Sequence, residues 1–277
     1  MIEVLALEHL GLVADGPTLT LTIGKGQAIC VAGPAAAGKT RMIRVLSGAE
    51  RPLQGSVRRH GTCASTLDVA ISRRQRVQAL AKKGGAIAGN ASKAAEILLA
   101  TQLWDVRHSL IADLTPGQSA ACDLIEPLSS ATDLVFIDGQ LDRLDPWALK
   151  STLQHISQMR AAGVAFVITT NRPDLIAAFD ALIVLKNNHV RFAGTVDDLL
   201  RMGPPHTLSV ATENRPGVQA LVAPFEVTVQ ESAEGVRLSA AEGQALAARL
   251  LLEGYGDVKF VVLRPPTVEE ALLSLFS

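Results

Sequence analysis

The sequence predicts an α/β fold: a parallel core sheet covered by helices, followed by a small ferredoxin-like α+β domain. Two observations support this fold class. Over the first 200 residues, short apolar runs alternate with helical patterns, which is typical of a parallel sheet with helices on both faces. After MGPPH at 202–206 the order becomes strand, helix, strand, strand, helix, strand, the split arrangement of ferredoxin-like domains. We therefore expect one domain over 1–203 and a second over 204–277.

The elements of the first domain follow from short stretches of sequence. Strands are expected where residues are apolar throughout or alternate polar and apolar, over IEVLAL, TLTLTI, QAICVAG, DLVFID, GVAFVITT and DALIVLK. Helices are expected over KTRMIRVLSG, SKAAEILLATQLW, QSAACDLIEPLSS, PWALKSTLQHISQMRAAG and a segment starting near Pro173. Residues 56–90 carry no clear pattern.

The second domain reads as alternating strands and helices. TLSVAT, FEVTVQ, GVRLSA and KFVVL are the expected strands. PGVQALV and AEGQALAARLLLEG are the expected helices, and VEEALLSLF adds a last short amphipathic helix.

Composition excludes several classes of protein. The net charge is -1 and no lysine or arginine block dominates, so nucleic acid is not expected as a partner. The three cysteines have no CxxC spacing and the six histidines no metal-ligand spacing, which favours a reducing cytoplasmic location without a zinc site. MIEVLALEHL does not resemble a signal peptide, and no apolar run reaches the length of a membrane span. If the protein works at a membrane, another chain supplies the membrane part.

A phosphate-binding motif follows the third expected strand. GPAAAGKT at 33–40, here called the phosphate loop, fits G-x-x-x-x-G-K-[ST] between a strand and a helix. Its backbone N–H groups and the positive end of the helix would hold phosphate oxygens. No Asn-Lys-x-Asp motif for guanine is present, so ATP with Mg²⁺ is the expected ligand. The residues expected to bind it are Gly33, Pro34, Ala35, Ala36, Ala37, Gly38, Lys39, Thr40 and Arg41.

Two oxygen ligands are expected for the magnesium ion. The Thr40 hydroxyl would bind it directly, and Asp138, at the end of the apolar run LVFID, would help to hold it, usually through water. The alternative for Asp138 is an ordinary cap at the start of a helix.

The order of motifs resembles the ATP-binding subunits of ABC transporters. GPAAAGKT looks like their Walker A, LVFID like Walker B, and RLDP at 143–146 like the D-loop. The resemblance covers roughly residues 1–202, and the portion ending RPPTVEEALLSLFS is similar to the extra domain of subunits that serve export permeases. A degenerate version of the family's signature LSGGQ is formed by Leu114, Thr115, Pro116, Gly117 and Gln118. In the family, this signature completes the nucleotide site of the partner subunit.

The sequence departs from this family at the positions of catalysis. Gly139 stands where the family has its catalytic glutamate, and the switch histidine would fall at Thr170 or Asn171. No aromatic residue for adenine lies near positions 9–12, where only His9 could stack. The family's glutamine loop cannot be placed securely, with Gln75 as the candidate. No residue is therefore assigned a catalytic role, and the resemblance implies impaired hydrolysis.

These departures lead to one expectation and two alternatives. The resemblance implies a degenerate subunit, peripheral on the cytoplasmic face of the membrane, that binds Mg-ATP weakly. Its partners would be a permease and a second, competent ABC ATPase subunit in a hetero-pair, whose site LTPGQ would complete. One alternative is a self-paired, slow ATPase that uses Gln140 or an unrecognised acid. The other is a non-hydrolysing, nucleotide-sensing regulatory or scaffold protein.

Overall fold

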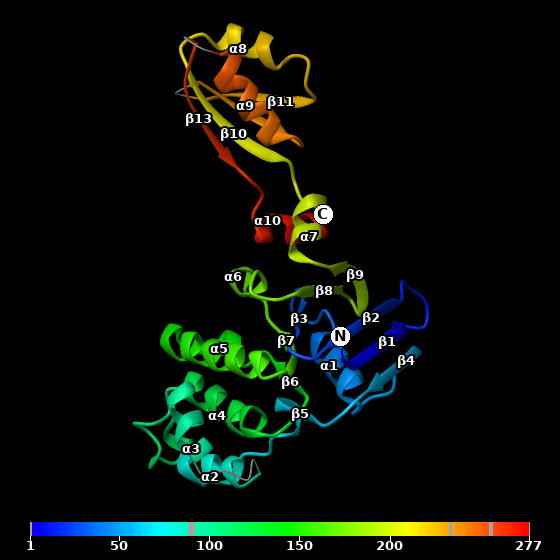
Figure 1. Ribbon diagram of the computed structural model, residues 1–277, viewed down its shortest axis with the longest axis vertical. Coiled ribbons are helices and arrows are strands. Elements are labelled where there is room, and N and C mark those ends of the chain that lie inside the picture. Colours follow the sequence, from blue (N-terminus) through cyan, green and yellow to red (C-terminus); the bar gives the residue numbers. More distant parts are fainter. Residues whose placement is uncertain (1, 88–91, 233–234, 255–256, 277) are drawn as a thin grey trace. The chain divides into compact units, whose positions relative to one another are not determined.

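The computed structural model describes residues 2–87, 92–232, 235–254 and 257–276. The chain divides into two compact units, Met1–Val196 (unit 1) and Asp197–Ser277 (unit 2) (Figure 1). The division falls at the start of helix α7 (Val196–Met202), whereas the sequence predicts a boundary just after this helix.

The main sheet of unit 1 has six strands in the order β5-β6-β7-β3-β8-β9. All neighbours run parallel except β9, which pairs antiparallel with β8. The core of the sheet is parallel as predicted, and β9 makes it mixed. The strands are β3 (Ala28–Ala32), β5 (Cys63–Ser65), β6 (Leu134–Asp138), β7 (Ala165–Thr169), β8 (Ala181–Lys186) and β9 (His189–Gly194).

A second, antiparallel sheet of unit 1 has the order β2-β1-β4. Its strands are β1 (Glu3–Gly11), β2 (Leu19–Gly24) and β4 (Gln54–Arg59). The first two agree with the predicted strands IEVLAL and TLTLTI. Four of the six residues of β4 are exposed, so this strand carries no apolar pattern that the sequence could reveal.

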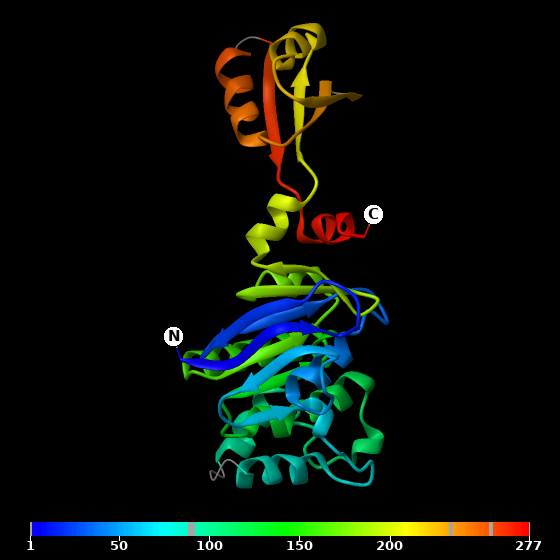
Figure 2. The ribbon, with the colours of Figure 1, turned by 90° about the vertical axis from the view of Figure 1, so that its right-hand side faces the viewer.

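The helices of unit 1 fall into two groups. α1 packs on β6 and β7, whereas α2 contacts α3 and α4, and α3 also contacts α5. Figure 1 shows α2 to α5 gathered on one side of unit 1, and Figure 2 shows the antiparallel sheet from another direction. The bounds are α1 (Lys39–Ser47), α2 (Val77–Ile87), α3 (Ser92–Ala100), α4 (Pro116–Ser129), α5 (Pro146–Ala161) and α6 (Pro173–Ile176), with short 3₁₀ helices η1 (Thr66–Asp68), η2 (Ile111–Asp113) and η3 (Leu141–Arg143).

The core of unit 1 joins both sheets to α1. Side chains of β1, β3, β6 and β7 pack with those of α1 in one cluster, which includes Leu5, Val31, Ile43, Phe136 and Val167. Cys30 and Cys122 are buried, as expected for small core residues, and burial raises the pKa of both thiols. All three cysteines are free.

Unit 2 has a four-stranded antiparallel sheet against which α8 and α9 pack. Its order is β11-β12-β10-β13, and β10, the first strand in sequence, pairs with β12 and β13. Leu208 and Leu238 of the sheet pack with Val218 of α8 and Leu250 of α9. The bounds are β10 (His206–Thr212), α8 (Arg215–Val222), β11 (Val227–Ser232), β12 (Gly235–Ala240), α9 (Gly243–Glu253), β13 (Val258–Arg264) and α10 (Val268–Ser274).

No helix within the described ranges combines the length and the apolar character needed to cross a bilayer.

Candidate functional site

The phosphate loop connects β3 to α1 and depends on its two glycines. Gly33 and Gly38 have φ of 145° and 104°, values that residues with a side chain rarely adopt. A Cβ added to Gly33 would lie 2.2 Å from the Leu185 carbonyl oxygen, and one added to Gly38 would lie 2.4 Å from Asn188 Oδ1. Ala36 also has a positive φ, of 60°. The sequence motif therefore adopts a tightly curled backbone, as its glycines predict.

Lys39 is the first residue of α1, and its side chain folds back over the loop. Its Nζ donates to the carbonyl oxygens of Gly33 and Pro34, at 2.7 and 2.8 Å. Burial lowers the pKa of Lys39, while the carboxylates of Asp142 and Asp138 act in the opposite direction. The exposed loop residues Pro34, Ala35, Ala36 and Thr40 leave this face of the loop open to a ligand.

A β-hairpin turn that the sequence analysis did not single out braces the loop. Asn187 and Asn188 join β8 to β9, with φ of 53° and 62°. The Asn188 N–H donates to the Ala37 carbonyl oxygen at 2.8 Å. Two asparagines between apolar runs are a typical signal for such a turn, because asparagine tolerates a positive φ.

Arg41, predicted to bind ATP, is held by the chain itself. Its Nε donates to Glu50 Oε1 and its Nη1 to the Leu12 carbonyl oxygen, both at 2.7 Å. Its side chain thus ties the segment after β1 to α1. His9, considered for stacking on adenine, is exposed and has a φ of 48°.

Asp138 ends β6 and is positioned by two threonines. Its N–H donates to Thr66 Oγ1 at 3.0 Å, and Thr169 Oγ1 donates to its Oδ1 at 2.9 Å. The next helix, η3, starts after Gln140 and has no side-chain cap, so the capping alternative for Asp138 finds no support.

The oxygens of Asp138 and Thr40 suit a magnesium ion. Within the described ranges, no three His, Cys, Asp or Glu side chains cluster as a metal site. Magnesium, however, is often held by one or two protein oxygens together with nucleotide phosphates and water. The donor set of the loop region fits such an ion.

The positions where the resembled family activates water are occupied by Gly139 and by Thr170 or Asn171. Gly139 has a φ of 81°, and an added Cβ would meet only Thr169 Oγ1, at 3.9 Å. The Thr170 hydroxyl, fully buried, donates to Asp142 Oδ1, and the Asn171 N–H donates to Asp142 Oδ2 at 2.9 Å. Asp142 is therefore an acid of the site that the sequence analysis missed, although it directly precedes RLDP.

The side chain of Gln140, the other candidate for positioning water, is buried. It is 9% exposed, and its Oε1 has no hydrogen-bond partner among the described residues. It lies near Asp123 of α4, where burial raises the pKa of the Asp123 carboxyl, and Arg143 and Gln140 lower it.

The signature residues form the start of α4. The Gln118 N–H donates to Thr115 Oγ1 at 3.2 Å, and the Thr115 N–H donates to Gln118 Oε1 at 3.1 Å, which makes a capping box. Pro116 occupies the first helical position, where a helix leaves its N–H unpaired. Proline therefore keeps the helix but removes one donor that could face a phosphate.

A pocket of about 420 Å³ lies beside the signature. The Ile111 N–H donates to the Gln75 carbonyl oxygen at 3.0 Å, so the segment containing Gln75 runs alongside this region. The pocket is lined by Val69, Ile71, Arg73, Ile111, Leu114, Pro116, Ser119, Asp123 and Arg143.

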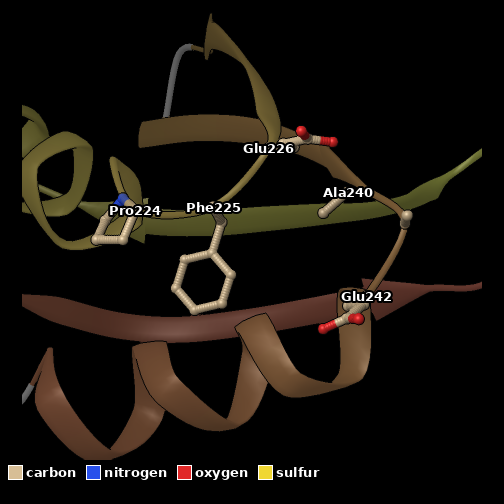
Figure 3. Close-up of a pocket in the computed structure, with 6 residues that line it drawn as sticks. Pro224, Phe225, Glu226, Ala240 and Glu242 are labelled. Atoms are coloured by element: carbon tan, nitrogen blue, oxygen red, sulfur yellow. The ribbon is translucent and has the colours of Figure 1, made fainter.

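Unit 2 has a pocket of about 300 Å³. Figure 3 shows the residues that line it, with the Phe225 ring near α9. The Arg249 guanidinium carbon lies 5.2 Å from the centre of the Phe225 ring. The pocket is lined by Pro224, Phe225, Glu226, Ala240, Ala241 and Glu242. None of these residues belongs to the phosphate loop or the signature.

Sequence comparison connects unit 1 with a known family. Residues 17–141 match the profile of the family described as ABC transporter. The spermidine/putrescine import ATP-binding protein PotA of Bacillus thuringiensis subsp. konkukian is 24% identical over 307 residues, covering 99% of this chain and 90% of that protein. The methionine import ATP-binding protein MetN 2 of Burkholderia mallei is 29% identical over 223 residues, covering 69% of this chain and 56% of that protein. Both are named import proteins, so neither supports the export kind of subunit that the resemblance implied.

Structural comparison agrees on the fold. An ATP-binding subunit of an ABC transporter superposes with a TM-score of 0.62 at 18% identity, covering 72% of this chain and 92% of that chain. A nucleotide-free ATP-binding cassette from an ABC transporter gives a TM-score of 0.58 at 18% identity, covering 70% and 92%. The chain thus has the P-loop α/β fold of these ATP-binding proteins, and its residues 17–141 are similar to the ABC transporter family.

Proposed function

We propose that the chain is a degenerate ATP-binding subunit of an ABC transporter, which binds Mg-ATP weakly and has impaired hydrolysis. One observation carries this proposal: a complete phosphate loop lies beside a position that lacks the catalytic acid. Lys39 and Asp138, the proposed phosphate and magnesium ligands, are both present, whereas Gly139 has no side chain and a Cβ added there would lie 3.9 Å from Thr169 Oγ1. A site of this kind can hold phosphates but has no glutamate beside Asp138 to polarise water.

The nucleotide phosphates would be held by the loop backbone from Gly33 to Gly38 and by the Lys39 ammonium. Thr40 and Asp138 would hold the magnesium ion, which neutralises phosphate charge when bound.

The affinity for ATP is expected to be low because few contacts with the adenine base are available. No Phe, Trp or Tyr occurs before Trp104, and Arg41 is held by Leu12 and Glu50. Loss of an aromatic stack would remove roughly 1–3 kcal/mol of binding free energy. That loss corresponds to an affinity about tenfold to a hundredfold lower.

The partners would be a permease and a competent ATPase subunit. Thr115 and Gln118 retain an ordered helix start that can face a partner's nucleotide. The burial of Gln140, near Asp123, disfavours the self-paired, slow ATPase that uses this side chain. The names of the relatives favour an import system, with the chain at the cytoplasmic face of the membrane.

Unit 2 would be a ferredoxin-like accessory domain that starts near residue 204. Its strand order β11-β12-β10-β13, with all neighbours antiparallel, supports this assignment.

Titration calorimetry with Mg-ATP tests the proposal. We expect Lys39→Ala to weaken binding by about tenfold or more, because charge-assisted hydrogen bonds to phosphate are lost. Lys150→Ala is the control, since this exposed lysine lies on α5. Phosphate release by the wild-type protein alone should stay near background. Unchanged ATP affinity in Lys39→Ala, or ordinary ATPase activity that Lys39→Ala abolishes, would overturn the proposal.

A further inference from the structure

Two carboxylates lie at the carboxyl end of β6, and consecutive residues of the β7 end hold them. Thr169 Oγ1 donates to Asp138 at 2.9 Å. Thr170 Oγ1 and the Asn171 N–H both donate to Asp142. Because neighbouring parallel strands end at the same edge of a sheet, this arrangement brings both acids to the side of the phosphate loop.

The carboxylate of Asp142 also affects the pKa of Lys39, the proposed phosphate-binding lysine. Burial lowers the pKa of Lys39, and Asp142 opposes this shift more strongly than Asp138 does. Asp142 also raises the pKa of Cys30, after burial itself, on the strand that leads into the loop. The nearby Arg172 guanidinium pairs with Asp174 at 2.7 Å. Asp174 raises the pKa of Arg172 most, and the Asp142 carboxylate adds to this rise.

The hydrogen bonds fix where the negative charge lies. Asp142 accepts one bond at each carboxylate oxygen, from the buried Thr170 hydroxyl and from a backbone N–H. Turning the carboxylate away would leave the Thr170 hydroxyl without this acceptor in a buried place, which is unfavourable. The charge is therefore held at the carboxyl ends of β6 and β7.

We infer that Asp142 is a specificity-determining residue that weakens binding of the γ-phosphate and so shifts the site towards nucleoside diphosphates. The inference rests on the proposed nucleotide binding at the phosphate loop. Lys39 reaches the outer phosphates of a bound nucleotide, and Thr170 or Asn171 stands where the resembled family has its γ-phosphate contact. A carboxylate at this point repels the terminal phosphate of ATP, whereas ADP ends one phosphate earlier.

The test compares Mg-ATP and Mg-ADP by titration calorimetry on the full chain. Asp142→Asn removes the charge and keeps an oxygen that can accept a hydrogen bond. We expect this variant to raise the ratio of ATP affinity to ADP affinity by about tenfold, mainly through tighter ATP binding. Asp133→Asn is the matched control, because it removes the same charge next to the opposite end of β6. The control should leave the ratio unchanged.

The outcomes separate this inference from the proposed function. Asp142→Ser is a second neutral variant for the case in which the asparagine variant does not fold, and Asp142→Glu, which keeps the charge, should retain the wild-type ratio. An unchanged or lower ratio in the folded neutral variants, with binding that still depends on Lys39, overturns only the role of Asp142. Absence of Lys39-dependent binding of either nucleotide in the wild-type protein overturns both.

Discussion

Gly139 occupies left-handed backbone, with a φ of 81°. Around its position there is room for a Cβ, which among the described residues would meet Thr169 Oγ1 at 3.9 Å. Backbone conformation, rather than space, is therefore the obstacle to an acid at this residue. For residues other than glycine the left-handed region costs roughly 1–2 kcal/mol.

Restoring the acid alone should not restore turnover. We expect Gly139→Glu to lower the free energy of unfolding by about 1–2 kcal/mol. Its steady-state phosphate release should rise by less than about threefold, because groups that act as a unit are strongly non-additive. Gly139→Ala is the control, since it carries the same backbone strain without the carboxylate.

The same prediction extends to a double variant. Asn171 is exposed, whereas Thr170 is fully buried, so an imidazole is better tolerated at Asn171. Gly139→Glu with Asn171→His should increase phosphate release by more than the product of the two single effects. Strong activity from Gly139→Glu alone would show that the γ-phosphate contact is not a missing part.

Some residues of the site can be predicted from a short stretch of sequence, whereas others can be identified only from contacts between distant segments. Lys39 and Thr40 follow from a short motif, and Asp138 from the end of an apolar strand, so sequence alone finds them. The roles of Asp142 and Asn188 depend on hydrogen bonds with Thr170 and Ala37, which lie in other segments of the chain. No local pattern could reveal these tertiary contacts.

At the scale of elements, the start of α4 depends on Thr115. Its hydroxyl accepts the Gln118 N–H, and the Gln118 side chain accepts the Thr115 N–H. We expect Thr115→Ala to lower the free energy of unfolding by about 1 kcal/mol in urea denaturation, because the cap is lost. Thr115→Ser keeps the hydroxyl and should retain nearly full stability. Equal loss in both variants would show that packing of the threonine methyl, rather than the cap, matters here.

Burial explains which elements the sequence reveals. β3 and β7 are buried throughout and read as continuous apolar runs. β4 and β9 expose several side chains, lie at sheet edges and are held by pairing with β1 and β8. Since their apolar content is low, only the partner strands define them.

At the scale of the whole molecule, the two units have separate cores. Limited trypsin digestion should first cut after Arg201, whose side chain is 79% exposed in the seven-residue helix α7. The products would be fragments 1–201 and 202–277, identified by mass spectrometry. Fragment 1–201 should keep Lys39-dependent nucleotide binding.

Arg201→Gln is the control for this digestion, because it removes the cleavage site without altering either core. Arg160 should resist, since its side chain bonds to the Gly26 carbonyl oxygen and to Asp180. Early cuts within 146–200 would contradict a domain boundary near 203.

The backbone at Gly139 also has an evolutionary consequence. A lineage that gained a glutamate here by one substitution would meet the left-handed conformation before any gain in activity could be selected. Asparagine and aspartate tolerate this conformation better, yet an aspartate side chain is one methylene shorter than glutamate. A second change that returned the turn after β6 to ordinary φ would remove the cost of about 1–2 kcal/mol that a glutamate meets here.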